Sequence, residues 1–443
     1  MRFLILLPSL LLMACGEIGL FSEDEELYYN YLLLKAYFYH PERIKKYSVY
    51  EGMEVDDMYE SLKDYFCGAR NTENCGDRYT FYTVPKEADQ KIEQIENTKK
   101  YYSFGFERSI IKKDGSPDTL RVSTVYPISP ANSADLKKGD KLLFANNTPL
   151  TGENAARYLR TDSLFDDTTA FRVLRGEKIE DLKAVKKAEV QSPTVFLDSL
   201  MGIPFITVTG YKVRSNDPNG TYAEFKNVLR EIKSTKTAIM DLRGNPGGSI
   251  GHCTAMAAEL VPFESELVYD EEHYYDSQRG NVIDSVHYFA KDFLSGEGEG
   301  VGIKWILLMN RYSASCSERF AAAVKYNRPD ETVIIGEASY GKGIGQMYAK
   351  TYSGGLAYIT CIQSFYPNGE TFHNIGILPD VPVPFGDTSA VYEAAFAAAQ
   401  GFGFEGILAK RLLSPLMPEE LPSGHKAEEI GGAYKFRLFH EWE

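Results

Sequence analysis

The chain has 443 residues, which is too long for one ordinary domain and fits about three. Hydrophobic residues make up 44% of the sequence, which is enough to build buried cores. The formal net charge is -14, and the sequence has no block or stripe of Lys and Arg of the kind that binds a phosphate backbone. Composition therefore excludes nucleic acid as a partner. The seven histidines are scattered and no HExxH or paired CxxC motif occurs, so the sequence predicts no metal ion and no cofactor.

Residues 1–15 are predicted to form a lipoprotein signal peptide. Arg2 precedes an apolar run of 11 residues, 3–13, which is shorter than the roughly 20 residues of a membrane-spanning helix. LMAC, which ends at Cys15, resembles the bacterial lipobox, in which cleavage leaves the cysteine to carry lipid. An ordinary secretory peptide with an incidental cysteine is the alternative. We expect a protein of the cell envelope, in the periplasm or on the outer surface, anchored to a membrane through Cys15.

Export places the other cysteines in an oxidising compartment. Cys67 and Cys75 flank the polar loop GARNTEN and are close enough in sequence to form a disulfide. Cys253, Cys316 and Cys361 lie in apolar or helical contexts, and we expect buried thiols there rather than metal ligands.

Two domains are predicted before the main α/β region. Leu and Tyr recur at helical spacing within 16–88, which predicts a small helical domain. Residues 89–190 change to short β-like runs, and SPANSADLKKGDKLLFANN together with an earlier FGF loop resembles a PDZ domain. This resemblance implies that the backbone around Phe104, Gly105 and Phe106 binds the terminal carboxylate of a peptide. A β-rich packing domain without a ligand is the alternative.

Residues 191–386 alternate between predicted strands and helices. TAIMDL, KWILLMN and TVIIG predict buried strands, and GHCTAMAAELV and SERFAAAVKY predict helices. This order implies a mixed, partly parallel sheet with helical crossovers, in which sites collect beyond the carboxyl ends of the strands. Residues 387–443 are expected to be a helical C-terminal segment. The expected fold class is therefore multidomain α/β.

Three predicted turns at the strand ends carry unusual residues. The first, DLRGNPGGS at 241–249, frees backbone N–H groups to bind an anion at the start of a helix, although this turn taken alone is better explained as a tight connection. The second, SASCSERF at 313–320, contains Ser315 and Glu318 in the S-x-x-E pattern of a helix capping box. A serine at a strand-to-helix turn is also exposed for nucleophilic attack, with the next amide free to donate to an oxyanion.

The third turn, GEASYGKGIGQ at 336–346, matches the G-x-x-x-x-G-K spacing of a phosphate-binding loop. Gly343 stands where that loop needs Ser or Thr to bind magnesium, which argues against a nucleotide site. A lysine between two glycines can instead act as a general base, provided that its amine is neutral.

DLRGNPGG, NRYSASCSE and GEASYGKGIGQ, in this order, are similar to the carboxyl-terminal processing peptidases, or tail-specific proteases, Ser-Lys enzymes with a PDZ domain before the protease core. The resemblance extends from about residue 77 to 383. Cys316 departs from the family pattern, which usually has alanine there, and makes a second nucleophile candidate. The resemblance implies that Ser315 is the nucleophile, Lys342 is the base and Gln346 orients the base. It also implies an oxyanion hole formed by Cys316 with Gly247, or with Gly248 as the alternative to Gly247.

Gln346 is also compatible with a structural role, because four residues of an ideal strand span about 13 Å. The predicted function is an exported serine endopeptidase that recognises protein C-termini. Its expected partners are protein or peptide substrates and the membrane, and the resemblance allows an adaptor protein and a homodimer. A catalytically silent PDZ scaffold lipoprotein is the alternative from another class, and a Ser-His-Asp hydrolase using His252 or His373 is a weaker rival.

Overall fold

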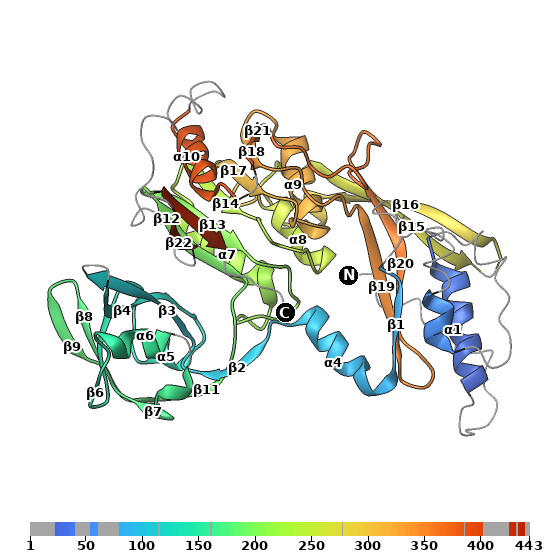
Figure 1. The fold of residues 1–443 in the computed structure, drawn as a ribbon. Helices are drawn as coiled ribbons and strands as arrows, with labels where there is room; N and C mark the ends of the chain where they lie inside the picture. The colour runs from blue at the N-terminus through green and yellow to red at the C-terminus, as the bar shows by residue number, and fades with distance from the viewer. Residues whose placement is uncertain are drawn as a thin grey trace. The chain divides into compact units, whose positions relative to one another are not determined.

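The computed structural model describes residues 23–39, 54–60, 79–113, 116–159, 162–276, 278–384, 386–401, 425–430 and 433–438 (Figure 1). The chain divides into two compact units. Of the described residues, unit 1 contains those within 1–91, 273–283 and 346–361, and unit 2 contains those within 92–272, 284–345 and 362–443. Cys15, Cys67 and Cys75 lie outside the described residues, so the expected lipid anchor and disulfide stay predictions. None of the helices in the described ranges is both long and apolar enough to cross a membrane.

Unit 1 is built on the first half of β20 (Leu356–Phe365). β1 (Phe81–Thr83) pairs with it in antiparallel register, from Phe81 opposite Tyr358 to Thr83 opposite Leu356. The helix α1 (Glu23–Tyr37) packs Leu27, Leu33 and Leu34 into an apolar cluster with Ala357 of this strand. α4 (Pro85–Glu96) follows β1, and its amphipathic sequence leaves Ala88 as its buried residue.

The first part of unit 2 is rich in β structure, as the sequence predicts. Five strands form one sheet in the order β3-β4-β5-β8-β9, with β6 (Thr148–Pro149) paired to β5. Its apolar cluster is covered by α5 (Pro130–Ser133) and α6 (Glu153–Leu159), which contribute Ala131 and Ala155. The sheet strands are β3 (Phe106–Lys113), β4 (Ser116–Val125), β5 (Lys141–Ala145), β8 (Phe171–Arg175) and β9 (Lys178–Asp181). Two short pairs accompany it, β2 (Lys100–Ser103) with β11 (Ala188–Gln191) and β7 (Thr168–Thr169) with β10 (Val185–Lys186).

The second part of unit 2 is a six-stranded mixed sheet in the order β12-β13-β14-β17-β18-β21. β12 and β13 form an antiparallel pair, and each later pair in this order is parallel. The prediction of a mixed α/β fold with a partly parallel sheet is confirmed. The strands are β12 (Val195–Leu200), β13 (Ile203–Val208), β14 (Thr237–Asp241), β17 (Lys304–Met309), β18 (Thr332–Gly336) and β21 (Val381–Pro382).

Helices cover both faces of this sheet (Figure 1). One face packs against α7 (Gly220–Ile232), α8 (Ile250–Ala258) and α9 (Cys316–Asn327), and the other against α10 (Thr388–Ala399). Strand residues alternate between the two faces, so that Met240 joins the first cluster and Ile239 the second. The strands are therefore buried on both sides, which explains their nearly continuous apolar sequences.

In unit 2, residues 362–365 of β20 pair in antiparallel register with residues 269–272 of β15 (Glu266–Asp276). β16 (Gly280–Phe289) lies beside β15, and β19 (Ile344–Lys350) pairs with β20. The predicted helical segment 387–443 contains α10. Further on, however, the described chain forms the hairpin β22 (His425–Ile430) and β23 (Ala433–Leu438), where the sequence AYKFRL alternates with the period of a strand rather than a helix.

Candidate active site

The three predicted turns follow neighbouring parallel strands of the six-stranded sheet. Turn 241–249 follows β14, turn 310–316 follows β17 and turn 337–343 follows β18. Because parallel strands end at the same edge, the turns meet there. Backbone bonds beyond the strands hold them together, since Leu242 N donates to Leu308 O (2.9 Å) and Glu337 N to Met309 O (3.1 Å).

Two asparagines join the first turn to the second. The Oδ1 atom of Asn310 accepts a hydrogen bond from Gly244 N at 3.1 Å. The backbone oxygen of Asn245 accepts from Ala314 N and from the Ser317 hydroxyl, both at 3.0 Å. Neither asparagine was singled out by the sequence analysis. Their only sequence signal is a polar residue inside a turn, which is common in turns of every kind.

A buried ion pair braces the start of the first turn. Arg243 donates to both oxygens of Asp241, at 2.9 Å through Nε and at 2.6 Å through Nη2. The same Nη2 donates to the Tyr392 hydroxyl of α10 at 2.9 Å, and the guanidinium lies 4.9 Å from that ring. A two-oxygen contact of this kind fixes orientation, so the DLR segment serves to hold the turn in place.

Ser315 lies immediately before α9 in an unusual backbone conformation. Its φ is 55° and its ψ is -114°, whereas a helix-capping serine has an extended backbone. Left-handed φ values cost an L residue roughly 1–3 kcal/mol and cluster at functional sites. The conformation matches the sharp strand-to-helix turn of a nucleophile and goes beyond what a capping role requires.

The carboxylate of Glu318 joins the second turn to the third. As a capping box predicts, Oε2 accepts from Ser315 N at 2.8 Å. The same oxygen also accepts from Lys342 N at 2.7 Å, and Oε1 accepts from Gly341 N at 2.6 Å and from the Ser339 hydroxyl at 2.5 Å. Burial raises the pKa of Glu318, against the opposing effect of these four donors. The backbones of Ser315 and Lys342 thus lie within hydrogen-bonding distance of one atom.

The loop that carries Lys342 is held on both sides. Gly341 O accepts from Asn374 N and Gly343 O accepts from Ser364 N, each at 2.8 Å. Lys342 is half-buried, and when protonated it would lower the pKa of the thiol of Cys316, the residue next to Ser315. The lysine therefore lies in the same neighbourhood as the start of α9.

A second buried ion pair lies beneath this loop. Arg319 Nη1 contacts a carboxylate oxygen of Asp270 and donates to the Ser364 hydroxyl at 2.9 Å. Ser364 in turn donates to Asp270 Oδ1 at 2.7 Å, and its backbone N–H is the one that holds Gly343 O. Since Arg319 follows Glu318 in the helix, α9 supports the lysine loop through two consecutive side chains.

Gly247 packs directly against the start of α9. A Cβ atom at this position would lie 2.8 Å from Ser315 Cβ and 2.9 Å from Cys316 N, so only glycine fits. The Gly247 N–H donates to Asn245 Oδ1 at 2.9 Å, so this N–H group already has an acceptor within the protein. Within the described residues, neither Gly248 N nor Cys316 N donates to a protein acceptor, so of the two alternatives the geometry favours Gly248 as the companion donor.

The other predicted site residues lie in different surroundings. Cys316 is 1% exposed, and burial followed by its contact with Cys253 raises the pKa of its thiol well above the ordinary value, which argues against this sulfur as a nucleophile. Gln346 belongs to unit 1, where its side-chain amide donates to the Thr360 hydroxyl at 3.1 Å. Its predicted role in orienting the lysine stays a prediction.

Phe104 and Phe106 lie in the apolar core of the β-rich sheet, at 0% and 5% exposure. Gly105 has φ 74°, and its N–H donates to the Ser103 hydroxyl at 3.1 Å. The two aromatic rings therefore stabilise the fold, and the predicted binding of a peptide carboxylate by the backbone of this segment stays a prediction.

The two candidate histidines also have definable neighbours. The Nδ1 atom of His252 accepts from Tyr222 N at the start of α7 (3.1 Å), and burial lowers the pKa of this imidazole. His373 lies beside Gly343, where a Cβ atom would come within 2.8 Å of His373 N. The first therefore has a structural partner, and the second lies next to the lysine loop.

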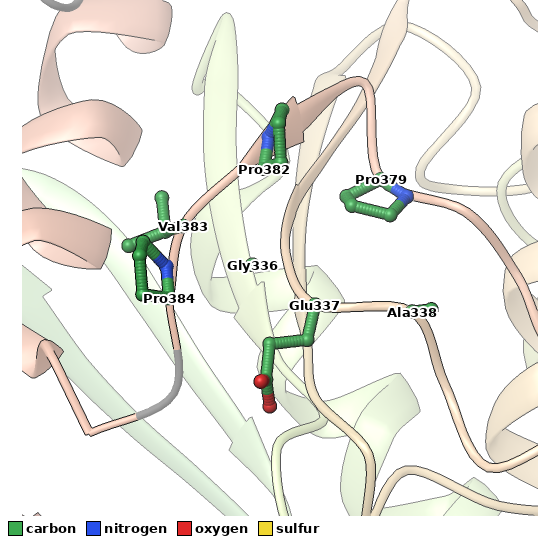
Figure 2. A pocket seen from close by; sticks show the side chains of 7 residues that line it. All are labelled: Gly336, Glu337, Ala338, Pro379, Pro382, Val383 and Pro384. Atoms are coloured by element: carbon green, nitrogen blue, oxygen red, sulfur yellow. The ribbon is translucent and has the colours of Figure 1, made fainter.

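A pocket of about 390 Å³ opens near the end of β18 (Figure 2). Its one charged side chain belongs to Glu337, whose carboxylate pairs with Arg311 at 2.6 Å. The pocket does not contain the candidate nucleophile or the lysine. Its lining residues are Gly336, Glu337, Ala338, Pro379, Pro382, Val383 and Pro384.

Comparison with known proteins agrees with the sequence resemblance. Residues 203–383 match Peptidase family S41. The chain is 22% identical over 367 residues to a probable CtpA-like serine protease of Staphylococcus haemolyticus, and 26% identical over 270 residues to one of Staphylococcus aureus. These matches cover 82% and 60% of the chain. The chain spans 65% and 50% of the lengths of these relatives.

Among solved structures, a putative S41 protease from Bacteroides fragilis is 12% identical, with a TM-score of 0.49 and coverage of 87% of this chain and 99% of the other.

Proposed function

We propose that this chain, whose residues 203–383 match Peptidase family S41, is a serine endopeptidase with Ser315 as nucleophile and Lys342 as general base. One observation carries the assignment of residues. The buried carboxylate of Glu318 accepts from the amides of both residues, which brings the two turns together. A scaffold that only binds peptides does not require this arrangement.

In the proposed reaction, the neutral amine of Lys342 takes the proton from the Ser315 hydroxyl as the oxygen attacks a peptide carbonyl. The resulting oxyanion is bound by the N–H groups of Cys316 and Gly248. Collapse of the tetrahedral intermediate breaks the peptide bond, and the leaving amino group of the substrate takes a proton from the Lys342 ammonium. The remaining acyl group stays bound to Ser315 as an ester. Water then hydrolyses this ester, with the lysine again acting as the base.

Gln346 is proposed to orient the lysine amine. The support is the family resemblance of the segment GKGIGQ. Replacement by alanine should then lower kcat and leave KM little changed, because the side chain acts through Lys342 and does not touch the peptide.

We further propose that the β-rich domain binds the C-terminus of a substrate. β3 lies at one end of its sheet, and in the described part of the chain no strand pairs with its outer edge. A peptide can add there as a further strand, with its carboxylate near the backbone of residues 104–106. A peptide acid should bind the Ser315→Ala chain at least tenfold more tightly than the corresponding amide, as measured by fluorescence anisotropy. Equal binding would contradict carboxylate recognition.

Cell-envelope location with a lipid on Cys15 is proposed from the leader sequence, and the substrates are then proteins outside the cytoplasm. An adaptor protein and a homodimer belong to the same proposal.

Cleavage of an unfolded reporter with an apolar C-terminus tests the enzymatic proposal. The full chain should cleave it and the Ser315→Ala and Lys342→Ala variants should not, whereas Cys316→Ala, His252→Ala and His373→Ala should remain active. Loss of activity in the Cys316 or in a histidine variant, with the fold preserved by circular dichroism, would favour a cysteine or a histidine mechanism. Binding of the reporter without cleavage by any form would favour the scaffold.

A further inference from the structure

Two cysteines meet behind the proposed nucleophile. Cys316 is the first residue of α9, and Cys253 lies in the first turn of α8. Their Sγ atoms are 2.6 Å apart, and the side chains are 1% and 0% exposed. The two helices pack together in one apolar cluster that includes both cysteines. Two buried thiols held this close are arranged for oxidation to a disulfide.

Each sulfur also contacts a backbone carbonyl oxygen at or just before the start of α8. The Cys316 thiol donates to Gly248 O, and the Cys253 thiol to Ile250 O, both at 3.3 Å. Thiols are weak donors, so these contacts contribute little to holding the pair together. A metal ion would need further ligands, and no group of three or more His, Cys, Asp or Glu side chains within the described residues could hold one.

We propose that Cys253 and Cys316 form a disulfide that ties α8 to the first residue of α9. The oxidant is a disulfide compound, either a small molecule or an oxidoreductase. One cysteine thiolate attacks a sulfur of this compound and releases one thiol, and the other cysteine then attacks the mixed disulfide and releases the second thiol. The two electrons and two protons leave with the reduced oxidant. Because both sulfurs are buried in the folded chain, the exchange takes place before α8 and α9 close on each other.

The bond has a consequence for the turn beside it, and this part rests on the proposed function. Oxidation removes the thiol proton that Cys316 donates to Gly248 O, while it fixes the Cys316 backbone next to Ser315. The disulfide would therefore hold Cys316, one proposed oxyanion donor, in place. It would also remove the thiol contact to the carbonyl oxygen of Gly248, the residue that supplies the other proposed donor. The existence of the bond is independent of whether the chain cleaves peptides.

Peptide mapping tests the bond directly. The full chain, exported through its own leader and purified from the cell envelope without reductant, is alkylated with iodoacetamide in denaturant and digested with trypsin. Cys253 and Cys316 then lie in separate peptides, 244–279 and 312–319, each with a single cysteine. The proposal predicts a linked pair that separates on reduction. Recovery of both peptides fully alkylated, or of either one linked to Cys67, Cys75 or Cys361, would overturn it.

Thermal unfolding gives a second measurement. A disulfide that closes a long loop of this kind should raise the Tm of the core by on the order of 5–10 °C. Reductant should therefore lower the Tm of the wild-type chain by more than that of Cys253→Ala, which cannot form the bond. Cys361→Ala, which removes a different buried thiol, should keep the full reductant effect. An equal reductant effect in wild type and Cys253→Ala would contradict the proposal.

Discussion

Replacement of Gly247 by alanine should abolish peptide cleavage, because the added methyl group would contact Ser315, the proposed nucleophile. The new Cβ atom would lie 2.8 Å from Ser315 Cβ, 2.9 Å from Ala314 O and 2.9 Å from Cys316 N. Overpacking of this kind costs about 1–3 kcal/mol. The backbone φ of 102° adds the left-handed penalty of an L residue, roughly 1–2 kcal/mol. Relief of the clash requires the turn that carries Ser315 and turn 241–249 to move apart.

The effect on activity should be larger than the effect on stability. A displacement of a reacting group by about 1 Å can cost roughly 100-fold in rate, so we expect kcat/KM of Gly247→Ala to fall at least that far. Gly244→Ala is the matched control. Gly244 lies in the same turn with φ 74°, but a Cβ atom there would have no described heavy atom within 4 Å. This variant should lose stability through its backbone alone and keep kcat/KM within a few fold.

The assay combines reporter cleavage with urea denaturation of each variant. A Gly247→Ala chain that stays folded in the assay and is only about 1–3 kcal/mol less stable than Gly244→Ala, yet loses at least 100-fold in kcat/KM, would place the damage at the site. If both variants cleaved the reporter equally well, the packing of Gly247 against Ser315 would have no role in catalysis, and the assignment of this turn would be refuted.

Three further predictions concern the supports of the site. Glu318→Gln places an amide N–H₂ against at least one backbone donor, so urea denaturation should show that the free energy of unfolding falls by about 2–5 kcal/mol. The control Glu337→Gln, which breaks a surface ion pair with Arg311, should lower it by under about 1 kcal/mol. Equal losses in the two variants would contradict the bridging role of Glu318. Asp270→Asn leaves the buried Arg319 without its counter-charge and should cost about 3–5 kcal/mol in the same assay, so a loss below 1 kcal/mol would contradict a paired buried charge. Because burial lowers the pKa of His252 below 6.5, the folded chain resists protonation of this imidazole, and the stability that this provides is present above pH 6.5 and is lost as the pH falls through the lowered pKa. The loss of unfolding free energy on acidification should therefore be smaller in His252→Asn than in the wild-type chain. Identical losses would contradict this effect of the histidine.

Much of the architecture follows from local sequence patterns. The strands β14, β17 and β18 are short apolar runs between helices of amphipathic or small-residue sequence, and this pattern specifies parallel neighbours whose ends share an edge. The meeting of the three turns could therefore be predicted without coordinates. The C-terminal hairpin was not predicted, although residues 433–438 alternate with the period of a strand.

The contacts within the site could not be read from the sequence in the same way. Glu318 has the sequence signature of a local helix cap, and nothing near it in sequence shows that its carboxylate also binds the loop at Lys342. The Gly247 N–H is occupied by Asn245, which changes the preferred oxyanion donor to Gly248. Similarly, Cys253 and Cys316 are 63 residues apart in the chain, and only the packing of α8 on α9 brings their sulfurs together. These interactions depend on how distant segments pack.

The measurement that tests the central claim most directly is the site of covalent labelling by a serine-reactive fluorophosphonate. Trypsin releases the candidate nucleophile in peptide 312–319, where fragmentation by mass spectrometry distinguishes Ser315 from Ser313, Ser317 and Cys316. We predict a single adduct on Ser315 whose rate of formation falls at least 100-fold in Lys342→Ala. An adduct on another residue of this peptide, or labelling of Ser315 at the same rate in the lysine variant, would contradict a Ser-Lys mechanism.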